Sequence, residues 1–124
     1  MENEVGDLIL TAATKVHRTL GPGLLEHVYE ACLARELAKL ELPFDRQRAL
    51  PVIYDGETIE EAFRIDLLVS GLVVVEIKAV ERLIEVHRAQ LLSYLKLGGF
   101  RLGYLLNFNT PLLKEGICRM VNRL

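Results

Sequence analysis

The feature that most constrains the fold is a run of mainly β-branched residues, Leu72–Lys78, which ends in the triplet Glu76-Ile77-Lys78. Valine and isoleucine favour strands, and a strand with apolar residues on both faces belongs in the middle of a sheet. Side chains two residues apart share a face, so Glu76 and Lys78 point the same way. The run therefore predicts a buried central strand with two charged groups at its end, where their desolvation must be offset by partners.

The rest of the chain alternates between two kinds of apolar spacing. Steps of three and four residues indicate amphipathic helices at Val5–Leu20, Leu24–Leu40 and Ile84–Leu97. Near-alternation and apolar runs predict strands at Phe44–Tyr54, Thr58–Val69 and Arg101–Asn107, and we favour a strand over a last helical turn at Ile117–Asn122. The expected class is α/β with a mixed sheet (α+β), in the order ααβββαβ(β).

Asp66 gives the Glu76-Ile77-Lys78 triplet a chemical interpretation. The Ser70-Gly71 turn folds the strand that contains Asp66 back against the central strand. Asp66 is four residues before Ser70 and Glu76 is five after Gly71, so the two carboxylates are expected nearly opposite each other. The triplet by itself is more typical of a solvated Glu/Lys pair at the end of a strand, and it is the position of Asp66 that favours a shared site.

Two facing carboxylates repel each other unless a cation lies between them. Mg²⁺ or Mn²⁺ suits this arrangement, because Mg²⁺ takes oxygen ligands and needs only one or two carboxylates besides water and phosphate oxygens. Such an ion would activate a water and stabilise a phosphodiester under attack, with Lys78 orienting or deprotonating that water. The pattern predicts metal-dependent hydrolysis centred on Asp66, Glu76 and Lys78.

Several other polar residues can join such a site. Glu26 and Tyr29 lie three apart on the second helix, and His87, Gln90 and Tyr94 share a face of the third. Each also has an ordinary explanation, as a helix-terminal acid, a core aromatic or a solvated stripe. Arg64 is one of several scattered cations that could supply local positive charge.

Composition restricts the alternatives. The 124 residues suit one domain spanning 1–124, and a net charge of -2 provides no global attraction for nucleic acid. Cys32 and Cys118 lack the spacing of a zinc site. We expect a cytoplasmic protein without membrane association, because the start is acidic and no apolar run is long enough to span a bilayer.

The sequence resembles the GxxExxY protein family, a branch of the PD-(D/E)XK nuclease superfamily, over nearly its whole length. Gly23-Leu24-Leu25-Glu26-His27-Val28-Tyr29 matches the Gly-x-x-Glu-x-x-Tyr signature that names the family. Asp66 followed by Glu76-Ile77-Lys78 is similar to the superfamily's split Asp and Glu-x-Lys motif. Gln90-Leu91-Leu92-Ser93-Tyr94 is similar to the Gln-x-x-x-Tyr motif of RecB-like and phage-exonuclease-like members.

This resemblance implies a restriction-endonuclease-like core and a role for each matching residue. Asp66 and Glu76 would be metal ligands, with Glu26 as a further acid in the metal shell. Lys78 would activate water and Gln90 would position that water or the substrate. Tyr94 would contact nucleic acid, and we add Arg64, His87 and Tyr29 as further candidates for that contact.

Three functional classes follow. The first is a Mg²⁺- or Mn²⁺-dependent nuclease acting on nucleic acid, DNA in preference to RNA. The second is a nucleic-acid- or protein-binding module that keeps the nuclease fold, which the small size and mildly acidic charge favour. The third is a structural protein whose acids form salt bridges. A homodimer would enlarge the binding surface, and self-association is expected for the first class.

Overall fold

The computed structural model describes residues 1–124 as three α-helices, one 3₁₀ helix and a five-stranded sheet. The elements are α1 (Glu2–Leu20), α2 (Glu26–Lys39), β1 (Phe44–Tyr54), β2 (Glu57–Val69), β3 (Val73–Lys78), α3 (Glu85–Gly98), β4 (Leu102–Asn107), η1 (Leu113–Gly116) and β5 (Ile117–Val121). The order and the mixed sheet confirm the expected α+β, restriction-endonuclease-like class. The segment at Ile117 is a strand, as favoured from the sequence, whereas η1 was not expected.

The sheet has the strand order β1-β2-β3-β4-β5, so β3 is its middle strand. All neighbouring strands pair antiparallel except β3 and β4, which are parallel with Val73 opposite Leu102. The first five residues of β3 are buried, which confirms the prediction of a central strand covered on both faces. Because parallel neighbours need a long connection, α3 crosses over the sheet between β3 and β4.

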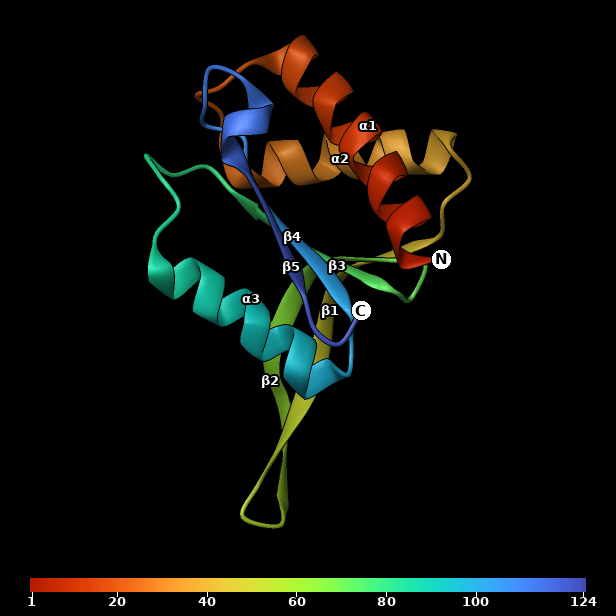
Figure 1. Ribbon diagram of the computed structural model, residues 1–124, viewed down its shortest axis with the longest axis vertical. Coiled ribbons are helices and arrows are strands. Elements are labelled where there is room, and N and C mark those ends of the chain that lie inside the picture. Colours follow the sequence, from red (N-terminus) through yellow and green to blue (C-terminus); the bar gives the residue numbers. More distant parts are fainter.

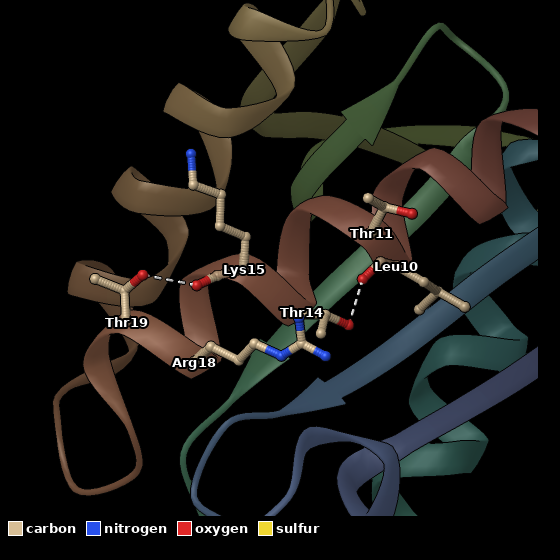
Figure 2. Close-up of a pocket in the computed structure, with 6 residues that line it drawn as sticks. All are labelled: Leu10, Thr11, Thr14, Lys15, Arg18 and Thr19. Carbon is tan, nitrogen blue, oxygen red and sulfur yellow. Dashed lines mark hydrogen bonds between the residues drawn. The ribbon is translucent and has the colours of Figure 1, made fainter.

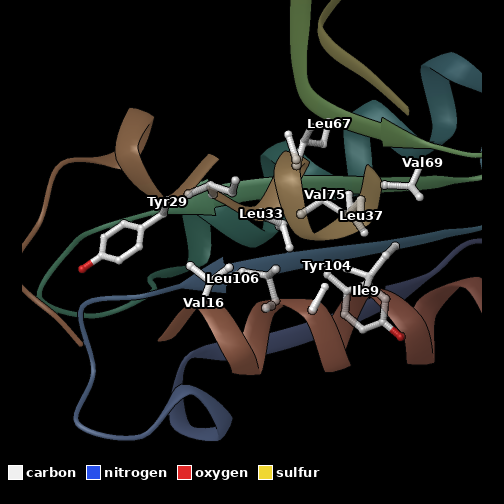
Figure 3. Packing of buried hydrophobic residues seen from close by; sticks show 14 of the residues in the cluster. Ile9, Val16, Tyr29, Leu33, Leu37, Leu67, Val69, Val75, Tyr104 and Leu106 are labelled. Atoms are coloured by element: carbon white, nitrogen blue, oxygen red, sulfur yellow. The ribbon is translucent and has the colours of Figure 1, made fainter. Parts of the chain in front are cut away.

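Helices cover both faces of the sheet (Figure 1). Helices α1 and α2 pack on one face, where Val73, Val75 and Ile77 belong to the larger core (Figure 3). Helix α3 packs on the other face, where Val74 meets Leu91 and Leu95. The alternation of β3 side chains thus divides the apolar interior into two layers, and Glu76 and Lys78 share the parity of Val74.

The helix boundaries follow local chemistry. The second helix starts at Glu26 and not at Leu24, because Leu25 is extended with φ -77° and ψ 153°. The third helix ends where the glycines predict, with Gly99 in the left-handed region at φ 71°. Glu26 is therefore the first residue of its helix. None of the helices combines the length and the apolar composition that crossing a bilayer requires.

The strands β1 and β2 continue beyond the body of the protein as a projecting hairpin (Figure 1). Its turn lies at Asp55 and Gly56, whose positive φ values of 52° and 79° match the tight turn expected from this dipeptide. The distal part of the hairpin is exposed, including Ile53 and Tyr54, which are 74% and 71% accessible. Only the end of β2 nearest β3, from Ile65 to Val69, enters the interior.

Candidate active site

The strands β2 and β3 separate where the two predicted acids lie. Their ladder runs from Val69 opposite Val73 to Leu67 opposite Val75 and then stops. Beyond it, the Asp66 N–H donates to Glu76 Oε2 at 2.8 Å and the Ile77 N–H donates to Asp66 Oδ2 at 2.8 Å. Each carboxylate thus replaces a backbone acceptor of the neighbouring strand. The structure brings Asp66 and Glu76 together as the turn-based count predicts.

Burial makes this pair electrostatically unusual. Glu76 is only 4% exposed, and burial followed by the nearby charge of Asp66 raises the pKa of Glu76 to about 8. Burial also raises the pKa of Asp66, although hydrogen bonds from Ile77 and Gln47 oppose this shift. A site that favours protonated carboxyl groups lacks positive charge, so it would gain from a bound cation.

Lys78 supplies part of that positive charge. Its proximity lowers the pKa values of both Asp66 and Glu76 against the larger effect of burial. Lys78 Nζ donates to Gln90 Oε1 of α3 at 3.4 Å, which joins the end of β3 to the helix above it. Gln90 itself is exposed. The amine, the amide and the two carboxylates therefore gather at one end of β3.

Tyr94 borders the same group of residues. Its ring stacks on Phe63 of β2 with centroids 4.4 Å apart and an interplanar angle of 17°. Burial, followed by the charges of Glu76 and Asp66, raises the pKa of the Tyr94 hydroxyl. The phenol thus lies within the electrostatic influence of the acids, while its ring stacks on Phe63 of β2.

The structure does not bring Tyr29 or Glu26 to this site. Tyr29 is completely buried, stacks on Phe108 at 4.5 Å, and donates its hydroxyl to Gly21 O at 2.7 Å. The hydroxyl also accepts the Leu24 N–H at 3.1 Å, so it fixes the entry to α2. The expectation that Tyr29 contacts nucleic acid is corrected, because no part of it reaches the surface. Glu26 is exposed and makes no hydrogen bond or ion pair with Asp66 or Glu76.

Glu30, one helical turn after Glu26, is the acid that α2 contributes instead. It is 7% exposed and forms an ion pair with Arg46 Nε at 3.0 Å. Its charge also contributes to the raised pKa values of Asp66 and Glu76. The four-residue step from Glu26 placed Glu30 on nearly the same helix face, and this spacing was the signal that could have identified it.

His87 and Arg64 have local partners. His87 Nδ1 accepts the Ile84 N–H at 3.1 Å and so caps the start of α3. Arg64 is exposed, donates from Nη1 to Gln47 O at 3.2 Å and lies 3.8 Å from Glu61. His87 Nδ1 thus caps the start of α3. Arg64, whose guanidinium is exposed, lies two residues before Asp66 on β2.

The donor set fits a hard divalent ion, although no three acidic, histidine or cysteine side chains converge closely enough to hold one by themselves. Asp66 and Glu76 offer carboxylate oxygens, and Glu76 Oε1 accepts no hydrogen bond from the protein. Because Mg²⁺ keeps several waters and binds few protein carboxylates, two acids are sufficient. The absence of thiolates and imidazoles from the site disfavours zinc.

None of the surface hollows is lined by Asp66 or Glu76. One of the largest lies on the outer face of α1 and is lined by threonines and two cations, Lys15 and Arg18 (Figure 2). Thr14 and Thr19 in this hollow donate to carbonyl oxygens of their own helix at 2.7 and 2.9 Å. The hydroxyl protons of both threonines are therefore already used in hydrogen bonds within α1.

One comparison with known proteins identifies the family of the chain. A family model described as PD-(D/E)XK nuclease superfamily matches residues 3–120. No curated protein and no solved structure matches the chain. The matched region contains all of α1 but its first residue, every element from α2 to η1 and most of β5, and it includes Asp66, Glu76 and Lys78.

Proposed function

Because the chain belongs to the PD-(D/E)XK nuclease superfamily, we propose that it is a divalent-metal-dependent nuclease that hydrolyses phosphodiester bonds of nucleic acid, DNA in preference to RNA. The observation that carries this proposal is the interlocked pair of carboxylates beside Lys78, in which Glu76 is buried and Asp66 is half-buried. The assignment to the GxxExxY branch is part of the proposal and rests on the motif from Gly23 to Tyr29.

Asp66 and Glu76 would hold Mg²⁺ or Mn²⁺ through their carboxylate oxygens. The bound ion would lower the pKa of a coordinated water and neutralise charge on the scissile phosphate. Lys78 extends from the same face of β3 and would orient that water or accept its proton. Gln90 would keep Lys78 in position through the contact between its Oε1 and Nζ.

The residues bordering the acids would bind the nucleic acid strand. Tyr94 offers a phenol beside the acids and Arg64 an exposed guanidinium, which could meet a base or a phosphate. His87 could take part through Nε2, since only its Nδ1 is bonded to the Ile84 N–H. Since the net charge of -2 provides no attraction for a duplex, we further propose that two copies associate to enlarge the surface.

The direct test incubates labelled single- and double-stranded DNA and RNA with the protein in Mg²⁺ or Mn²⁺. The parent should cleave DNA, whereas Asp66→Ala and Lys78→Ala should not. Lys114→Ala serves as the matched control, because Lys114 is exposed on η1 away from the acids, and it should cleave like the parent. Equal cleavage by all variants would indicate a contaminating nuclease, and a preference for RNA would redirect the substrate assignment.

The competing function is a non-catalytic binding module, which the acidic net charge and the burial of Glu76 favour. In that case Lys78→Ala should retain full affinity for its nucleic acid or protein partner. No cleavage by the parent in either metal, together with unchanged binding by Lys78→Ala, would support this alternative over the nuclease.

A further inference from the structure

Gln47 of β1 joins the two acids that lie on opposite sides of it. Its Nε2 donates to Glu30 Oε1 at 2.7 Å and to Asp66 Oδ1 at 3.3 Å. One NH₂ group, whose hydrogens carry partial positive charge, therefore donates to two carboxylates from two different elements. This is the kind of position that a cation takes among oxygen ligands.

The backbone of β1 is distorted to place this side chain. Gln47 has φ 51°, a left-handed conformation that is unfavourable for a residue other than glycine. The pairing of β1 with β2 includes Arg46 and Arg48 but omits Gln47 and Asp66 between them. Arg64 Nη1 donates to Gln47 O at 3.2 Å and holds the distorted carbonyl. Strain of this kind persists where the surrounding structure imposes it, often at functional sites.

The amide of Gln47 also has an unused acceptor. While Nε2 is bonded to Glu30 and Asp66, Oε1 accepts no hydrogen bond from the protein. Rotation about the last side-chain torsion of glutamine exchanges the two atoms, and this torsion has broad minima. The oxygen is a hard ligand of the type that Mg²⁺ and Mn²⁺ accept, and the acids alone provide no cluster of three.

We propose that Gln47 is a metal ligand that switches: its amide nitrogen holds Glu30 and Asp66 together in the metal-free protein, and its Oε1 turns to the divalent ion when one binds. The inference rests on the proposed function, because it concerns the ion of that site. It adds a ligand from β1 to the carboxylates of β2 and β3. Glu30 would then keep its ion pair with Arg46, and its Oε1 would be free to accept a hydrogen bond from water around the ion.

Mn²⁺ binding by calorimetry tests the ligand role without measuring cleavage. Gln47→Met keeps the length of the side chain but has no amide, so its affinity for Mn²⁺ should fall about tenfold or more. Gln47→Glu keeps an oxygen ligand and should bind Mn²⁺ at least as tightly as the parent. Its metal-free form should melt at a lower temperature, because a third carboxylate would then face Glu30 and Asp66.

Selective labelling observes the switch directly. Gln47 and Gln90 are the only two glutamines in the chain, so glutamine labelled with ¹⁵N in its side chain should give two NH₂ groups in an NMR spectrum. Addition of Mg²⁺ should move the Gln47 signals towards those of a solvent-exposed amide, since the bonds to the acids are lost. Gln47→Met assigns the signals, and Gln90 provides the internal comparison.

The outcomes separate this inference from the proposed function. If the parent binds Mn²⁺ and cleaves nucleic acid but Gln47→Met binds Mn²⁺ as tightly or more tightly, Gln47 only blocks the site and the ligand role is wrong. Unchanged Gln47 NH₂ signals at saturating Mg²⁺ would equally overturn the switch. A parent that neither binds Mn²⁺ nor cleaves overturns the proposed function and this inference together.

Discussion

The two faces of β3 arise from one strand of six residues but are used in opposite ways. On one face Val73, Val75 and Ile77 pack beneath α1 and α2 in the larger apolar core. On the other face Val74 joins the smaller core under α3, while Glu76 and Lys78 carry charge. Glu76 is almost as inaccessible as its apolar neighbours, at 4% exposure. The apolar face stabilises the fold, whereas the other face lowers its stability, because burying the carboxyl group of Glu76 costs free energy.

The largest expected effect is the loss of cleavage when the carboxyl group of Glu76, on the face of β3 beneath α3, is replaced. Glu76→Gln keeps the size of the side chain but removes a proposed metal ligand, so cleavage should fall by about a thousandfold. Thermal unfolding measured on the same preparation should show a fold at least as stable as the parent. A variant that cleaves normally would separate Glu76 from the reaction.

A substitution on the apolar face of β3 should lower stability and leave cleavage unchanged. Ile77→Ala removes a side chain that is 1% exposed and should lower the free energy of unfolding by about 2–5 kcal/mol. Urea unfolding measures this loss. Cleavage per folded molecule should remain near that of the parent at low temperature. If cleavage instead disappears while stability is retained, the two faces are not independent.

The pH dependence of stability should sharpen the difference between the faces. The folded-state pKa of Glu76 is raised from 4.5 to about 8, so the folded protein holds more protons than the unfolded chain between these values. The metal-free protein should therefore lose stability as pH rises from about 4.5 to 8 and then level off, by on the order of 2 kcal/mol after allowance for water entering the site. Melting temperatures across this range should decline.

Two controls belong with that experiment. Glu76→Gln should flatten most of the pH dependence, and saturating Mg²⁺ should reduce it in the parent, because an ion favours the ionised carboxylate. A parent whose stability rises over the same pH range would show that Glu76 titrates at a lower pKa and that its burial is relieved.

The smallest expected effect concerns Tyr29, which belongs with the apolar face. Tyr29→Phe removes the hydroxyl that bonds Gly21 O and the Leu24 N–H, so the free energy of unfolding should fall by about 1 kcal/mol. Binding to nucleic acid should not change. Weaker binding with unaltered stability would return Tyr29 to the surface role first expected from its motif.

Much of the fold follows from short-range patterns in the sequence. The β-branched run placed β3 at the centre, and the turn at Ser70-Gly71 set Asp66 against Glu76, since both depend on residues close in the chain. Glu30 and Gln47 were missed because their contact joins a helix to a strand 17 residues away. The contact also depends on the left-handed backbone at Gln47, which the conformational preference of glutamine does not predict. For Tyr29 the sequence left a core position and a nucleic-acid contact both open, because the partner that fixes its burial, Phe108, lies near the other end of the chain.

The parallel pairing of β3 with β4 determines the face of the sheet on which α3 and its side chains lie. Crossover connections between parallel strands are right-handed in nearly all proteins, so the direction in which β4 is added decides the side on which the helix lands. Placing β4 on the opposite edge of β3 would carry Gln90 and Tyr94 to the far side of the sheet, away from Lys78 and the acids. The handedness of the polypeptide, and not any attraction between these side chains, is thus what delivers the helix to the reactive end of the strand.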